Sequence, residues 1–206
     1  MAQERAVRTR ERVLDAAAEA FATRGFAQTT LETVVAGTGV SKGALYGHFR
    51  SKEELARALV AHAGNAWGML LAQAGHGARD PLEALRVLTI GLAARLGADM
   101  RLRAAVRLAS ELPPDQHDLG DPLGPLPARM AELAALAQAD RTVSPGHTPA
   151  AVATLLLATV VGAQALPGLR IDQELPVGIE DLWPLLEAGL RAQPAPGADA
   201  ETLTAS

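Results

Sequence analysis

The side chains in this sequence that are best suited to ligand chemistry are hydrogen-bond donors within one short stretch. Between positions 41 and 52 stand Ser41, Lys42, Tyr46, His48 and Lys52, with Gly43 among them. Hydroxyl, ammonium and imidazole donors suit phosphate oxygens and the floor of a major groove. A glycine among them allows the backbone to approach a partner closely. The residue types therefore predict a surface for nucleic acid.

Two short helices joined by a tight turn are expected to carry these donors. Thr30 stands ahead of an apolar-periodic run over residues 31–35, where its hydroxyl can accept from free amides of the first helical turn. That helix ends at the Gly-Thr-Gly of residues 37–39, where one glycine can take the positive φ of a helix end. Val40 then fills the angle before the next helix.

Ser41 is the expected N-cap of the second helix, which covers residues 42–47. Ala44 and Leu45 can pack inward on this helix, so the donors remain outside. Two such helices with a glycine-containing turn between them predict a helix-turn-helix. This motif places its second helix in the major groove of DNA.

A third helix is expected to begin at Ser51. Ser51 and Glu54 have the spacing of a capping box, in which each side chain binds the backbone amide of the other residue. Lys52 lies in the first turn of this helix, where exposed amides and its ammonium can meet one phosphate.

These residues resemble the DNA-reading segment of the TetR family of one-component repressors. The agreement in residue type and spacing extends roughly over residues 8–60 and is carried by Thr30, Val34, Gly39, Val40, Ser41, Gly43, Tyr46, His48, Phe49, Lys52 and Leu55. The resemblance implies repression of transcription. It also implies DNA contacts by Thr30, Ser41, Lys42, Gly43, Tyr46, His48 and Lys52.

Within that family, residues 34–36 and 41–46 are most similar to the γ-butyrolactone autoregulator receptors and their relatives, the pseudo-receptors. Two positions depart from the pattern, because Gly47 stands where many relatives carry an aromatic residue and Thr38 replaces a usual alanine. Such receptors use a tryptophan before the seventh helix, and Leu126 is its nearest equivalent here. The difference favours a receptor-like regulator that responds to another ligand, such as a pathway antibiotic or intermediate, or to no small molecule.

Charge is unevenly distributed along the 206 residues. Residues 1–60 carry nine Lys or Arg against seven Asp or Glu, whereas residues 61–206 carry ten against sixteen, within a total of −4. A mildly basic head on an acidic body is compatible with one face that meets DNA.

The sequence has no cysteine, which excludes disulfides and thiolate chemistry. Charged residues at the start and the lack of a bilayer-length apolar run favour a cytoplasmic protein.

Helical periodicity accounts for most of the remaining chain, and no convincing strand is visible. Further helices are expected over residues 3–24, 51–74, 80–97, 100–112, 128–139, 148–166 and 177–192. The sequence thus predicts an all-α chain of about nine helices. We expect a helix-turn-helix DNA-binding domain over residues 1–50, a helical ligand-binding and dimerisation domain over residues 51–193, and a disordered tail over residues 194–206.

The first of these helices begins with four arginines, Arg5, Arg8, Arg10 and Arg12. Such a run is typical of a solvated helix start, but it also suits an arm near a phosphate or in a minor groove. The sequence leaves both interpretations open.

The helix over residues 148–166 has no charged residue, so we expect burial on nearly all of its sides. Together with the apolar helix 177–192 it has more surface than one small body easily buries. Pairing both helices with those of a second copy would give a homodimer, with two heads about 34–36 Å apart on a palindromic operator. The alternative is that both helices fill the core of a single subunit.

The family resemblance also implies an apolar pocket in the body whose filling releases DNA. Candidate lining residues are Leu85, Leu88, Val106, Leu126, Met130, Leu155 and Thr159. The Thr159 hydroxyl can bind a lactone or keto oxygen, or it can bind the carbonyl of the preceding turn. For the other six, ordinary core packing is the commoner role of such residues.

An enzymatic activity is not expected, and neither is a metal or a cofactor. The five histidines, His48, His62, His76, His117 and His147, are scattered and lack the spacing of a helical metal pair. The acidic residues around His117 fall in a loop rich in proline and glycine, where solvated carboxylates are the commoner situation. The alternative to a ligand-responsive repressor is a DNA-binding regulator whose body only dimerises or docks a protein partner.

Overall fold

The computed structural model describes residues 2–112, 119–165 and 178–191. Within these residues the fold consists of nine helices and no strand, as the sequence predicts. The helices are α1 (Ala2–Arg24), α2 (Leu31–Thr38), α3 (Lys42–His48), α4 (Lys52–Gly77), α5 (Pro81–Ala98), α6 (Met100–Glu111), α7 (Leu126–Ala139), α8 (Pro149–Ala165) and α9 (Ile179–Leu190). The helix stops predicted at residues 113–114 and 167–168 and the tail over residues 194–206 lie outside the described residues.

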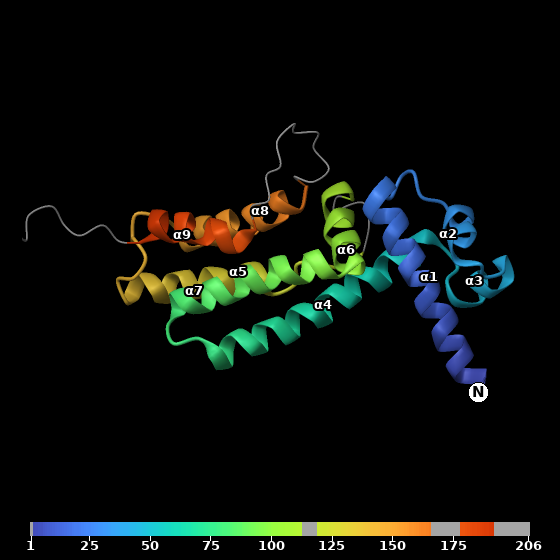
Figure 1. The fold of residues 1–206 in the computed structure, drawn as a ribbon, viewed down its shortest axis with the longest axis horizontal. Helices are drawn as coiled ribbons and strands as arrows, with labels where there is room; N and C mark the ends of the chain where they lie inside the picture. The colour runs from blue at the N-terminus through green and yellow to red at the C-terminus, as the bar shows by residue number, and fades with distance from the viewer. Residues whose placement is uncertain (1, 113–118, 166–177, 192–206) are drawn as a thin grey trace, which may run out of the picture.

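The helices form a small head and an elongated body (Figure 1). α1, α2 and α3 lie together at one end of the molecule, and the amino-terminal end of α1 projects beyond them. α4 leads from the head along the body and packs against α5, while α7 packs against α5 and α8. α6 lies at the junction, where it contacts α1 of the head and α4 and α5 of the body. Of the body helices, α6 has the most extensive contact with the head.

The head folds around apolar side chains from each of its helices. Phe21 of α1, Val34 of α2 and Leu45 of α3 are all buried. Phe26, in the turn after α1, stacks on Phe21 with 5.7 Å between ring centroids. Helices as short as α2 and α3 are unstable in isolation, so this shared core is what holds α3 in position.

The end of α4 and the start of α7 differ from those predicted. Gly75 and Gly77 do not break α4, because neither has the positive φ of a helix end, and the helix continues to Gly77. A glycine in such a position only weakens a helix, by about 1 kcal/mol relative to alanine. α7 begins at Leu126 rather than at residue 128, because Pro127 falls in its first turn, where a missing N–H is harmless.

One helix is less buried than expected. α8 is not buried on nearly all sides, since Leu155 and Val161 are 47% and 37% exposed in the single chain. Its neighbours α5, α7 and α9 cover only part of its circumference. The apolar composition of α8 thus exceeds what a single subunit covers.

The core of the body is mainly aliphatic, and Trp67 of α4 is one of its largest buried side chains. Its Nε1 donates to the backbone oxygen of Pro122 at 2.7 Å. Since Pro122 lies just before α7, this bond joins α4 to the segment that leads into α7. None of the helices in the described part of the chain is long and apolar enough to span a bilayer.

Candidate nucleic-acid interface

The polar side of α3 faces solvent. Ser41, Lys42, Gly43 and Tyr46 are exposed, Tyr46 by 42%, whereas Leu45 is fully buried on the opposite side. A Cβ added to Gly43 would meet no atom within 4 Å. The packing of the chain therefore does not require glycine here, and the space over this position is open to a partner.

The turn before α3 is built by residues that the sequence singles out. Gly39 follows α2 with a φ of +63°, the left-handed conformation that favours glycine. The Thr38 hydroxyl accepts from the N–H of Val40 at 3.0 Å, and the Thr38 carbonyl accepts from the guanidinium of Arg12 on α1. Threonine in place of the usual alanine therefore gives the turn a hydrogen bond that alanine cannot make.

Side-chain caps fix the start of both short helices. Ser41 Oγ accepts from the N–H of Ala44 at 3.2 Å, which confirms the predicted cap of α3. Thr30 is confirmed as the cap of α2, because its Oγ1 accepts from the N–H of Thr33 at 3.2 Å. Thr33 Oγ1 in turn accepts from the N–H of Thr30 at 3.1 Å. This reciprocal pair was missed in the sequence, because the usual pattern has Glu or Gln at the second position.

The start of α4 differs in part from the prediction. Ser51 Oγ accepts from the N–H of Glu54 as expected, but the Glu54 carboxylate accepts from the N–H of Arg50 rather than that of Ser51. Lys52 Nζ donates to the backbone oxygen of Phe26 at 3.1 Å and lies 4.2 Å from the centroid of the Phe26 ring. The ammonium thus stabilises the turn after α1, with two donors left over.

Lys42 is paired with Glu32 across α2 and α3. Its Nζ lies 3.1 Å from the Glu32 carboxylate and 5.9 Å from the centroid of the Tyr46 ring. Hydrogen bonds from the backbone N–H of Glu32 and from Lys42 lower the pKa of Glu32, and the same pairing raises the pKa of Lys42. Exposed pairs of this kind are weak, so the ammonium is free to exchange its partner for a phosphate. His48, at the end of α3, is half-buried.

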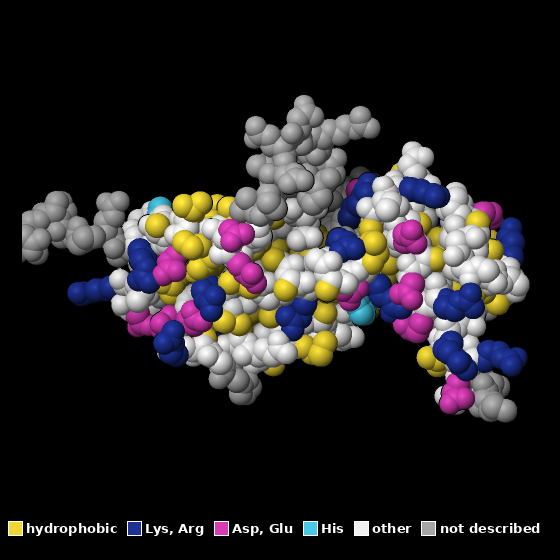
Figure 2. Space-filling view, in the orientation of Figure 1, with side chains coloured by type: hydrophobic (Ala, Val, Ile, Leu, Met, Phe, Trp, Pro, Cys, Tyr) yellow, Lys and Arg dark blue, Asp and Glu magenta, His cyan; other side chains and the backbone are white. Residues whose placement is uncertain are grey.

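The four arginines at the start of α1 separate into two groups. Arg10 lies 5.4 Å from the centroid of the Phe49 ring, and Arg12 donates to the carboxyl end of α2, so both belong to the structure of the head. Arg5 and Arg8 are exposed on the projecting end of α1. Figure 2 shows several Lys and Arg side chains at this end of the molecule.

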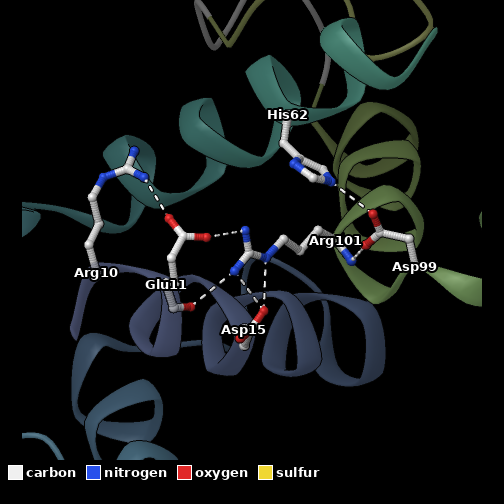
Figure 3. A network of polar contacts seen from close by, with 6 residues as sticks. All are labelled: Arg10, Glu11, Asp15, His62, Asp99 and Arg101. Carbon is white, nitrogen blue, oxygen red and sulfur yellow. Dashed lines mark hydrogen bonds and ion pairs between the residues drawn. The ribbon is translucent and has the colours of Figure 1, made fainter. Parts of the chain in front are cut away.

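A polar network joins the head to the body at the start of α6 (Figure 3). Arg101 donates to Glu11 Oε2 at 2.6 Å and to Asp15 Oδ1 at 2.8 Å, both on α1. Asp99, the N-cap of α6, accepts from the backbone N–H of Arg101 at 2.8 Å. Its other carboxylate oxygen lies 2.8 Å from Nε2 of His62 on α4. Three helices are thus connected through one cluster of side chains.

These contacts shift the pKa values of the groups involved. The hydrogen bond from Arg101 lowers the pKa of Glu11. Burial acts to raise the pKa of Asp99, but hydrogen bonds from His62 and from the N–H of Arg101 outweigh it, so the pKa is lowered. Burial acts to lower the pKa of Arg101, yet its bonds to Glu11 and Asp15 leave the pKa raised. Glu11, Asp99 and Arg101 are therefore charged at neutral pH.

A second polar contact holds the other end of α6 against the head. Arg107 donates to the backbone oxygen of Ala22 at 2.7 Å and to Glu111 Oε1 at 2.6 Å. Glu111 Oε2 accepts from the N–H of Phe26 at 2.7 Å. Gly25 has a φ of +81°, and a Cβ there would lie 2.6 Å from the Glu111 carboxylate. The positive φ favours glycine here, and a side chain would also displace the Glu111 carboxylate from this contact.

The three arginines of α6, Arg101, Arg103 and Arg107, all bind groups on other helices. Arg103 donates to the backbone oxygens of Leu96 and Gly97 at the carboxyl end of α5. The other two bind α1. Helical periodicity cannot reveal such partners, because they lie on other helices and, for α1, far away in the sequence.

Comparison with known proteins agrees with this geometry. A family model described as bacterial regulatory proteins, tetR family, matches residues 13–59, from α1 into α4. The crystal structure of a gamma-butyrolactone receptor (ArpA-like protein) is similar to this chain with a TM-score of 0.77 and 31% identity, over 91% of this chain and 90% of that one. The chain belongs to the TetR family.

Two further relatives are similar to this TetR-family protein. CprB from Streptomyces coelicolor, in complex with its operator sequence, has a TM-score of 0.71 and 30% identity over 91% of this chain and 90% of that one. The probable HTH-type transcriptional regulator ArpR of Pseudomonas putida is 36% identical over 102 residues. The chain spans about half (49%) of the length of the curated relatives that it matches in this way. It is a DNA-binding transcriptional regulator and not an enzyme.

The residues predicted to line a ligand pocket in this TetR-family protein are distributed over several places. Leu88 lines a cavity between α4, α5 and α7. Val106 lines a cleft that also includes residues of α1, α5 and α8, and Leu155 lines a groove between α8 and α9. The three sites are separate.

The other predicted lining residues contact none of these three sites. Leu85, Leu126 and Met130 are fully buried in the core. The Thr159 hydroxyl donates to the backbone oxygen of Leu155 at 2.7 Å, which is the bond to the preceding turn. The described residues contain no group of three or more His, Asp or Glu side chains able to hold a metal ion. Most of the predicted acidic loop lies outside them.

Proposed function

We propose that this protein is a dimeric repressor that binds a palindromic operator through α3 of each subunit. A small apolar ligand, either a γ-butyrolactone-type signal or a pathway antibiotic or intermediate, would release it. The observation that carries the DNA-binding part is the exposed surface at α3, where Ser41, Lys42 and Tyr46 face solvent and the space over Gly43 is open. The related CprB, solved with its operator, supports the same use of the head.

The proposed DNA contacts are made by Thr30, Ser41, Lys42, Gly43, Tyr46, His48 and Lys52. Ser41 keeps its hydroxyl proton for donation, because the cap uses only its oxygen. Lys42 would leave Glu32 for a phosphate, and Lys52 would use the donors that Phe26 does not occupy. We keep residues 1–50 as the DNA-binding domain and residues 51–193 as the ligand-binding and dimerisation domain. A regulator that binds chromosomal operators would act in the bacterial cytoplasm.

Uncovered apolar side chains on α8 and α9 support dimerisation. Leu155 of α8 is 47% exposed, and Leu185 of α9 is 71% exposed. Exposed apolar patches of this kind are typical of protein interfaces. A two-fold pairing of α8 and α9 with the same helices of a second copy would cover them. It would also place two α3 helices on successive major grooves.

Operator binding tests the DNA-binding part of the proposal. Genomic fragments bound by the full chain would first be selected and sequenced, and affinity for a palindrome among them measured by mobility shift at fixed salt. Lys42→Ala and Tyr46→Ala should each weaken binding about tenfold or more, with the dimer unchanged by size-exclusion chromatography. Arg129→Ala, on α7 of the body, is the control and should bind like the wild type. Unchanged affinity in both α3 variants would contradict the assignment.

The alternative is a DNA-binding regulator whose body only dimerises or docks a protein partner. It is favoured by one observation, namely that the predicted lining residues do not converge on one cavity. A thermal-shift screen separates the two functions, since an inducer must both raise the melting temperature and release the operator. Ligands that raise the melting temperature without releasing the operator would favour the alternative.

A further inference from the structure

We infer that the cleft between the head and the body is the effector site of this regulator, and that it accepts an amphipathic organic anion. The cleft, called the junction cleft below, is lined by Ala22, Leu96, Arg103, Val106, Ser110 and Val161, together with neighbouring residues of the same helices. The ligand class is an apolar ring system or chain that carries one carboxylate, sulfonate or enolate group. This inference rests on the proposed ligand-responsive function.

The size and lining of the junction cleft suit a small organic molecule. Its volume is about 550 Å³, within the range of known small-molecule sites. Leu96 of α5, Met100 and Val106 of α6 and Val161 of α8 form its apolar walls. Four helices thus contribute side chains, and one of them is α1 of the DNA-binding head.

Arg103 supplies the charge that selects an anion. A guanidinium has five N–H donors, and the described contacts of Arg103 are two bonds from Nη1 to the oxygens of Leu96 and Gly97 and one from Nη2 to Met100 Sδ. Its Nε–H and one Nη2–H remain. No carboxylate of the described residues forms an ion pair with Arg103, whereas Arg107 beside it is paired with Glu111. A partly buried cation without a counter-charge favours an anionic ligand.

Two hydroxyl groups in the cleft can orient a ligand further. Ser110 donates to the backbone oxygen of Arg107 at 2.8 Å, and Thr23 donates to that of Glu19 at 2.7 Å. Both hydroxyl oxygens therefore retain acceptor capacity for a donor group on the ligand.

An occupant of the junction cleft would contact the residues that hold α6 to the head. Arg107 lines the cleft and donates to the backbone oxygen of Ala22, which lines it from the α1 side. A ligand that fits one arrangement of α1 and α6 better than another shifts the equilibrium between them. Couplings of this kind change affinity at the second site by about 5- to 150-fold. A ligand bound in the cleft would thus change the orientation of the head and of α3 within it.

A matched pair of fluorescent probes tests the site and its ligand class. 8-Anilino-1-naphthalenesulfonate and N-phenyl-1-naphthylamine share one aromatic skeleton, and only the first carries an anionic group. Both would be titrated into the full chain at fixed salt. We expect the sulfonate to bind about tenfold or more tightly, as one charge-assisted hydrogen bond allows. Equal affinity of the two probes for the wild type would contradict an anion-selective site.

Variants then locate the site of binding. Arg103→Gln should remove the preference for the sulfonate and keep the binding of the neutral probe. Val106→Trp should fill the cleft and abolish both, and Ser110→Phe does the same from an exposed position if Val106→Trp folds poorly. Arg95→Gln is the matched control, because Arg95 also has no ion pair among the described contacts but lies outside the cleft. A preference that persists in Arg103→Gln, or probe binding by folded Ser110→Phe, would overturn the inference.

The operator supplies an independent readout. The sulfonate should weaken operator binding by the wild type about fivefold or more, and not by Ser110→Phe. If the unliganded protein binds no operator, the proposed function fails while the probe titrations still decide whether the cleft binds anions. If another compound releases the operator equally well from the wild type and from Ser110→Phe, the function stands and the cleft is not the effector site.

Discussion

Gly25 and Gly43 are glycines for different physical reasons. Gly25 has a φ of +81° and faces the Glu111 carboxylate at the contact of head and body, so the fold itself excludes a side chain. Gly43 lies in a helix with no atom near its missing Cβ. In the free protein a side chain at Gly43 is harmless, and only a bound partner can exclude it.

Gly43→Ala should therefore change stability and DNA binding in opposite directions. Alanine favours the helix by up to about 1 kcal/mol, so the melting temperature should rise slightly. Operator affinity in a mobility shift should fall about tenfold or more, because a methyl group would prevent close approach of the DNA backbone. Gly68→Ala, at an equally open position on α4, should raise stability and leave affinity unchanged. Unaltered operator binding by Gly43→Ala would remove this residue from the interface.

At the scale of the helix, α6 is the element that holds the head to the body. Arg101 near its start binds Glu11 and Asp15 of α1. Near its end, Arg107 binds the last turn of α1 and Glu111 binds the turn after α1. Most of these bonds use a carboxylate as acceptor, so the stability of the head–body contact depends on pH.

Lowering the pH should weaken the contact between the head and the body. The pKa of Glu11 is lowered below its ordinary value of 4.5 in the folded protein. The stability from this shift is thus complete above about 4.5 and is lost as the pH falls through the folded pKa. Arg101→Gln removes the main cause of the shift, so its melting temperature should fall less steeply than that of the wild type as the pH is lowered from about 4.5. Arg129→Gln, on α7, should retain the wild-type slope. Equal slopes in all three proteins would contradict a role for Arg101.

The elements of the head could be predicted from sequence because their signals are local. Thr30, Ser41 and Gly39 act within a few residues of their own position, and each has the predicted role at a helix end. Arg101 and Arg107 could not be placed in this way. Their partners lie about 85 to 90 positions earlier on α1, and only the packed structure brings them together.

The remaining differences between the predicted and the observed site arise from side-chain contacts that the sequence does not reveal. Lys52 was assigned to a phosphate from its place in a first helical turn, but its nearest partner is Phe26, on the segment before α2. The pocket residues were chosen for apolar character alone, which core and cavity positions share. Burial of Met130 and exposure of Leu155 depend on how α7 and α8 pack, and composition does not determine that.

At the scale of the whole molecule, the uncovered face of α8 and α9 predicts the oligomeric state. Leu155→Glu or Leu185→Glu would place a charge in the proposed interface, which is strongly unfavourable in an apolar contact. Either variant should convert the dimer to a monomer in light scattering and weaken operator binding by removing the second head. Met69→Glu, at an exposed apolar position on α4, should remain dimeric. A wild-type protein that is already monomeric at micromolar concentration would refute the predicted interface.

The two tryptophans of the chain occupy positions from which changes inside the body and changes at α9 can be reported separately. The indole of Trp67 is enclosed in the body and bonded to Pro122, while that of Trp183 lies on α9 with its N–H bonded to Glu187 at 2.9 Å. Trp183→Phe would leave intrinsic emission from the body interior alone, and Trp67→Phe would leave emission from α9 alone. Changes inside the body and changes at α9 can then be followed in real time without an attached dye.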